Sequence, residues 1–139
     1  MITEEAKKKI NLFLQNFFLV GNVGVGSDAT NPNANTLDVP ILTANETLTI
    51  TNTGDTSTDF KLVVLGSQLS ASVVREFGVF GTLPQDNAFD EMYGGTANPA
   101  TGGSNYASET TMLTRLSFEG LGPFNNSDEI TFTVSVEVE

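Results

Sequence analysis

Apolar and polar residues alternate almost without interruption over the last twelve positions of the chain. The apolar members of this pattern are Ile130, Phe132, Val134, Val136 and Val138. Hydroxyl-bearing or acidic residues stand between them. Because successive side chains of a strand point to opposite faces of a sheet, the pattern predicts a half-buried antiparallel strand over residues 128–139.

Similar but shorter patterns recur along the chain. They predict strands at residues 46–52, 59–65, 72–80 and 112–118, and a short one at 23–26, with a turn at 54–57. About six short strands with Gly-, Asn- and Thr-rich connections favour one mainly β domain over residues 1–139, an antiparallel β-sandwich. Its predicted core comprises Leu62, Val64, Phe77, Leu116, Phe118, Ile130, Phe132, Val134 and Val136.

Residues 3–19 predict one N-terminal α-helix. Thr3 can cap it, and acidic residues follow in the first turn, where the helix dipole favours anions. An apolar stripe follows the helical period, consisting of Ala6, Ile10, Phe13 and Phe17, widened by Leu14 and Phe18. The stripe is expected to pack on the sheet or on a neighbouring subunit, with Lys7, Lys8 and Gln15 facing elsewhere.

The stripe carries more apolar surface than one small sheet face readily covers. Exposed apolar patches of that kind mark interfaces. We therefore expect Phe13, Phe17 and Phe18 to contribute to self-association into a trimer or a symmetric ring.

Two long connections separate the predicted strands, at residues 27–38 and 81–108. The second contains Asp86, Asp90 and Glu91 but no basic residue, so it is unable to close on itself through ion pairs. We expect a neighbouring chain to order it, with Phe89, Met92 and Tyr93 as anchors. Bound Ca²⁺ is the competing explanation, because carboxylate oxygens are its usual ligands.

Composition narrows the possible chemistry. The 139 residues include no Cys and no His, which removes thiol nucleophiles, disulfides, His bases and the common transition-metal ligands. The net charge of −11 disfavours nucleic acid as a partner. No apolar run approaches the roughly 20 residues of a membrane span, and the N-terminus does not read as a secretory signal.

No motif indicates catalysis. Gly21, Gly24 and Gly26 have the wrong order for a dinucleotide fingerprint, and glycines of a strand and turn explain them better. The sequence singles out no pair of carboxylates for glycoside hydrolysis, and it contains no Gly-x-Ser-x-Gly motif that would mark a serine nucleophile. The chain is expected to be no enzyme and to need no cofactor, the Ca²⁺ alternative aside.

Arg75 and Glu76 are adjacent charged residues inside a predicted strand. They point to opposite faces, so each charge lies among apolar residues and needs a partner. An ion pair within the domain, for example between Glu76 and Arg115, is the simplest expectation. A pair across an interface is the alternative.

Three segments together resemble a family of short phage structural proteins, related to the N-terminal domain of tail-collar fibre proteins. The first is the opening helix, residues 2–9, with the short strand at 23–26. The second is Val-Val-Arg-Glu-Phe-Gly-Val-Phe at 73–80, which resembles the family's IREVGLF signature. The third is Thr-Met-Leu-Thr-Arg-Leu-Ser-Phe at 111–118 with the closing strand, which resembles LLARATF…TLTVTWTI. The long connection at 81–108 departs from the family, which usually has a short turn there.

This resemblance implies a non-enzymatic component of a tailed-phage virion, oligomeric and located at the tail, baseplate or fibre attachment. Its partners would be copies of itself and other virion proteins. A head decoration or cement protein is one alternative. A carbohydrate-binding adhesive module is another, in which Tyr93 or Tyr106 stacks on a glycan of the host surface.

Overall fold

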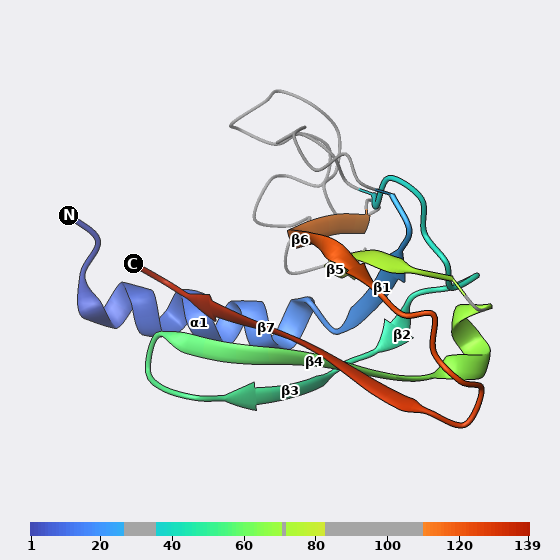
Figure 1. The fold of residues 1–139 in the computed structure, drawn as a ribbon. Helices are drawn as coiled ribbons and strands as arrows, with labels where there is room; N and C mark the ends of the chain where they lie inside the picture. Colours follow the sequence, from blue (N-terminus) through green and yellow to red (C-terminus); the bar gives the residue numbers. More distant parts are fainter. Residues whose placement is uncertain (27–35, 71, 83–109) are drawn as a thin grey trace.

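The computed structural model describes residues 1–26, 36–70, 72–82 and 110–139, which form a β-sandwich with one helix beside it (Figure 1). The larger sheet has the order β2-β1-β5-β6. Its strands are β1 (Val20–Gly24), β2 (Glu46–Thr47), β5 (Val74–Thr82) and β6 (Thr110–Leu121). The smaller sheet, in the order β3-β4-β7, comprises β3 (Thr49–Asn52), β4 (Ser57–Leu65) and β7 (Glu129–Glu137). All strand pairs are antiparallel, as predicted.

Helix α1 (Glu4–Phe17) begins where the sequence predicted. The Thr3 hydroxyl accepts a hydrogen bond from the Ala6 backbone N–H at 3.2 Å, which satisfies one of the free donors of the first turn. The helix ends two residues earlier than predicted. The chain then enters β1, which runs from Val20 to Gly24 instead of the predicted 23–26.

The predicted strand at residues 46–52 is divided between the two sheets. Thr47 pairs with Val20 of β1, whereas Thr49 pairs with Lys61 of β4. Leu48, between them, is buried, and its N–H donates to the Leu19 carbonyl at 2.9 Å. One continuous segment therefore closes this side of the sandwich, and the alternating pattern gave no sign of the change of sheet.

The other predicted strands are present with shifted ends. The turn predicted at residues 54–57 joins β3 to β4, and a short 3₁₀ helix, η1 (Gly66–Leu69), links β4 to β5. Strand β5 continues to Thr82, so the predicted connection from 81 begins later. Residues 83–109 lie outside the described part of the chain.

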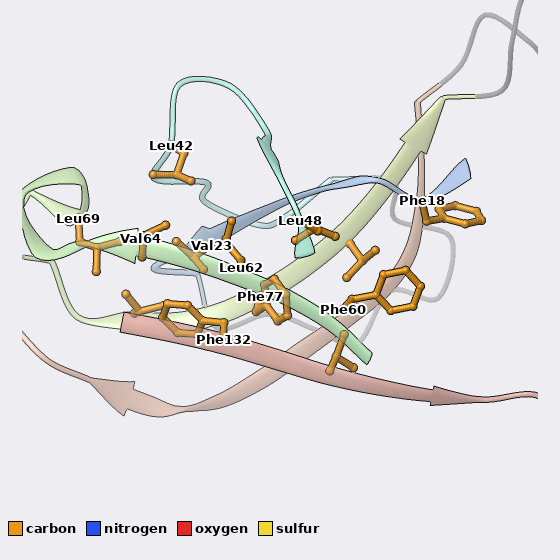
Figure 2. Close-up of a cluster of buried hydrophobic side chains, with 13 residues drawn as sticks. Phe18, Val23, Leu42, Leu48, Phe60, Leu62, Val64, Leu69, Phe77 and Phe132 are labelled. Carbon is orange, nitrogen blue, oxygen red and sulfur yellow. The ribbon is translucent and has the colours of Figure 1, made fainter. Parts of the chain in front are cut away.

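The core fills the space between the two sheets (Figure 2). The rings of Phe77, from the larger sheet, and Phe132, from the smaller, lie 5.9 Å apart. The burial predicted for Leu62, Val64, Phe77, Phe132 and Val134 is confirmed, and Phe118, Ile130 and Val136 pack against them half-buried. Leu116 was predicted wrongly: it is 37% exposed, because β6 lies at the edge of its sheet.

Candidate functional site

Helix α1 docks against the body of the sandwich along its polar side, and Leu14 and Phe17 of its apolar stripe also pack against the core, as predicted. Asn11 is only 2% exposed and is the one buried residue of the helix. Its amide nitrogen lies 3.2 Å from the carbonyl oxygen of Gly54 and 3.3 Å from those of Asp55 and Ser57. Its amide oxygen accepts from the Thr58 hydroxyl at 2.6 Å. Asn11 therefore supplies a donor to part-buried backbone carbonyl groups at the β3–β4 turn.

Lys8 and Gln15, which were expected to face elsewhere than the apolar stripe, do so and contact the body of the sandwich. Gln15 donates to the Thr58 hydroxyl at 2.8 Å, beside Asn11. The Lys8 ammonium lies 3.6 Å from the Asp55 carboxylate. These contacts follow from the docking of Asn11, because residues three or four positions away lie on the same helix face.

The apolar stripe of α1 is exposed only in part, because Leu14 and Phe17 pack half-buried against the core whereas Ile10 and Phe13 point outward. Ile10 and Phe13 are 39% and 38% exposed, and Phe17 is half-buried. The Phe13 and Phe17 rings lie 4.3 Å apart. We call Ile10, Phe13 and Phe17 the aromatic face of α1.

A small apolar hollow adjoins the aromatic face. It measures about 90 Å³ and is lined by Phe13, Phe17, Phe18, Gly81 and Thr111. A Cβ at Gly81 would overlap the Phe17 carbonyl oxygen, so glycine lets β5 approach the end of the helix this closely. The hollow extends the aromatic face onto the rim of the larger sheet.

The predicted interface residues therefore separate into three groups. Phe13 and Phe17 lie on the aromatic face. Phe18 was assigned to an interface wrongly, because it is buried in the chain's own core. Phe89, Met92 and Tyr93 lie outside the described residues.

The Glu76 carboxylate is buried, with a residue exposure of 1%, on the outer side of the larger sheet. Its Oε2 accepts from the N–H groups of Gly26 at 3.0 Å and Val39 at 2.9 Å, and its Oε1 accepts from the Asp38 N–H at 2.9 Å. The carboxylate thus fastens the segment after residue 35 to the end of β1. Backbone donors satisfy it, so the predicted ion pair with Arg115 is not needed.

Among the described residues, neither Arg75 nor Arg115 is a partner of the Glu76 carboxylate. Within the described ranges, neither forms an ion pair, and the four ion pairs present all involve lysines of α1. Arg75 is exposed and lies beside Gly120 of β6, whereas Arg115 is half-buried opposite Gly78. The prediction that Glu76 needs a partner is confirmed, but the nature of the partner was wrong.

Gly24 and Gly26 are explained by the same carboxylate. A Cβ at Gly24 would overlap Glu76 Oε2 and the Val39 carbonyl oxygen, and one at Gly26 would lie 2.7 Å from Glu76 Oε2. The glycines make room for the buried acid. The sequence showed both the glycines and Glu76, but only the fold brings them into contact.

A second hollow, of about 430 Å³, lies over the outer side of β1 and β5. Leu37, Leu42, Asn45 and Phe80 are among its lining residues, together with Asn22. The Asn22 amide already donates to the Leu42 carbonyl and the Asn45 side chain, and its oxygen accepts from Val23 and Leu42. The lining thus offers mainly apolar surface and an amide already bonded within the fold.

The glycan and calcium hypotheses concern residues that the structure leaves undescribed. Tyr93 and Tyr106, and the acids Asp86, Asp90 and Glu91, lie outside the described ranges. Within those ranges, no group of three or more His, Cys, Asp or Glu residues converges as a metal site. No described helix is long and apolar enough to span a membrane.

Fold and surface together define an acidic β-sandwich that displays an aromatic helix face. Comparisons with protein-family models, with curated proteins and with solved structures found no match to this chain.

Proposed function

We propose that this chain is a non-enzymatic structural component of a tailed-phage virion, which assembles through protein–protein contacts at the tail, baseplate or fibre attachment. The observation that carries the proposal is the aromatic face of α1. The virion assignment rests on the resemblance of residues 73–80 and 111–118 to the tail-collar family.

The aromatic face suits an interface because it is ordered before any partner arrives. Asn11 binds the β3–β4 turn and Gln15 binds Thr58 of β4, while Phe17 packs half-buried on the core, so Ile10 and Phe13 are held outward. Ile10 and Phe13 retain more than a third of their surface. Burying that surface in an interface gains about 1 kcal/mol for each of the two side chains. Because the docked helix already holds these side chains in place, little conformational entropy is lost on binding.

The charge distribution also favours protein partners. From residue 10 onward, three basic residues stand against 15 acidic ones. Such a surface repels phosphate backbones but steers basic protein surfaces towards it. The aromatic face and the acidic surface would suit a head decoration protein equally well. The position of the protein in a virion map distinguishes that role from a role in the tail. A glycan-binding role would instead require Tyr93 or Tyr106 at a binding surface.

A pair of variants in one helix tests the aromatic face. Ile10→Asp introduces a charge into it, whereas Leu12→Asp places the same charge at a residue that is 48% exposed. Two helical positions correspond to a rotation of about 200°, so Leu12 lies on another side of α1. We expect wild type and Leu12→Asp to sediment as the same trimer or ring, and Ile10→Asp to sediment as a folded monomer.

Location in the virion tests the rest of the proposal. Purified phage particles should contain the protein, and a virion map should place it in symmetric contact with neighbouring copies or other tail proteins. A wild-type protein that stays monomeric at high concentration, together with isolated copies in the map, contradicts self-assembly. Absence of the protein from purified particles contradicts the virion assignment.

A further inference from the structure

The two lateral sides of the sandwich differ in the length of their edge strands. On one side the edge strands are β2 and β3, of two and four residues, joined through Leu48. On the other side the edge strands are β6 and β7, of 12 and nine residues. The long edges therefore lie on the side where residues 122–128 connect the two sheets, with β7 in front in Figure 1.

The two long edges are not alike. Strand β6 pairs with β5 through two register shifts, near Val74 and near Val79. Bulges of that kind twist an edge and protect it from further pairing. Strand β7 pairs with β4 residue by residue, from Glu137 opposite Ser57 to Glu129 opposite Leu65, without a shift. It also contains no proline and no lysine.

We propose that β7 accepts an additional antiparallel strand from a partner protein, and that this strand carries a basic residue at each end. Glu129 and Glu137 stand at the two ends of β7, are both exposed, and form no ion pair among the described residues. The exposed residues between them, Thr131, Thr133 and Ser135, are short and hydroxyl-bearing. Added strands bind through their backbone, and alternate side chains provide specificity.

The other face of β7 favours an apolar alternation in the partner. Phe132 and Val134 are buried at the centre of the strand, whereas Ile130 and Val136 are half-buried towards its ends. Apolar residues of an added strand would extend the core beside these positions. The partner strand is therefore apolar at alternate positions, with basic residues eight positions apart on the other face.

A second copy of this chain fits the edge poorly. If two β7 strands paired about an axis at Thr133, Glu129 of each copy would lie opposite Glu137 of the other. Like charges directly opposite each other destabilise a strand pair. A net charge of −11 on each copy adds long-range repulsion. The edge of β7 thus favours a basic partner strand over the β7 strand of a second copy.

A pair of synthetic peptides tests the charge pattern on the intact protein. Both match the nine residues of β7 in length, with valine at even positions and threonine at positions 3, 5 and 7. One carries arginine at both ends, the other glutamate. We expect calorimetry to give at least about tenfold tighter binding of the arginine peptide, and the variant Glu129→Lys/Glu137→Lys to reverse that preference. Equal binding of both peptides overturns the proposal.

Register-specific cross-linking tests the geometry. The chain contains no cysteine, so a single introduced thiol is unique. In the proposed register, position 5 of the arginine peptide lies opposite Thr133 at a Cα separation of about 4.5–5.5 Å, within disulfide range. A peptide with cysteine there should form a disulfide with Thr133→Cys and not with Thr131→Cys. Equal yields with both variants, or a cysteine variant that dimerises through β7 in preference to the peptide, contradict the proposal.

The contact is independent of the aromatic face. Ile10→Asp should therefore bind the arginine peptide as the wild type does, even if it no longer assembles. Loss of peptide binding in that variant, with the fold intact, would place the peptide on α1 and overturn the assignment to β7.

Discussion

The buried carboxylate of Glu76 permits a direct test of how the fold is held together. In Glu76→Gln the amide oxygen can take over the position of Oε2 and accept from Gly26 and Val39. The amide NH₂ then occupies the position of Oε1, where it meets the Asp38 N–H, which now donates at 2.9 Å. Two donors face each other, and the part-buried Asp38 N–H loses its bond to the side chain of residue 76.

The expected loss follows from these three bonds. Hydrogen bonds to a charged acceptor contribute about 1.5–3 kcal/mol each, and neutral ones about 0.5–1.5 kcal/mol. Two bonds are weakened and one is lost, but the neutral amide costs less to bury than a carboxylate. We expect the free energy of unfolding to fall by about 2–3 kcal/mol, which lowers Tm by roughly 6–12 °C for a chain of this size.

Chemical denaturation and calorimetry measure the loss, and Glu119→Gln is the matched control. Glu119 is exposed and makes no hydrogen bond or ion pair within the described residues, so its substitution should change stability by less than about 0.5 kcal/mol. Amide hydrogen exchange should quicken at Gly26, Asp38 and Val39 in Glu76→Gln only. If the two variants are equally stable, the three backbone bonds contribute nothing measurable, and this account of Glu76 is refuted.

Two further substitutions test the docking of α1 and the assignment of the core. Asn11→Ala should cost about 2–3 kcal/mol, because it removes the amide donor to the Gly54 and Asp55 carbonyls and the acceptor of the Thr58 O–H. Asn16→Ala, exposed on the same helix, is its control in urea denaturation, and an equal effect of both would show that the polar contact is not what holds the helix. Phe132→Ala should cost about 3–5 kcal/mol, because it removes a ring that contacts Phe77 and Phe118 from a closely packed core. The exposed neighbour Thr133→Ala should cost far less, and a loss below about 1 kcal/mol for Phe132→Ala would contradict its central place in the core.

The sequence by itself determined the elements whose cause is local. The alternation at the C-terminus identified β7 and the residues it buries, since a strand has a period of two. Thr3 identified the start of α1, because a helix cap depends on residues three positions apart. The turn at residues 54–57 and the mainly β class followed from similar short-range rules.

The tertiary structure decided everything that depends on which segments meet. Periodicity located an apolar stripe on α1, of which Leu14 and Phe17 pack on the core, but it did not show that the helix also docks through Asn11, because the β3–β4 turn presents carbonyl groups that only a donor can satisfy. Pairing also decided that Leu48 passes between the sheets and that Leu116 stays at an open edge.

Glu76 shows the same division most clearly. Its position inside a strand showed that a partner was needed, since burying a carboxylate unsatisfied is costly. Which partner it has depends on backbone groups about 37 to 50 positions away in the sequence, brought beside it by the glycines of β1 and the segment that follows. The sequence therefore determined where bonds were required, and only the fold, by bringing distant donors within reach, determined what supplies them.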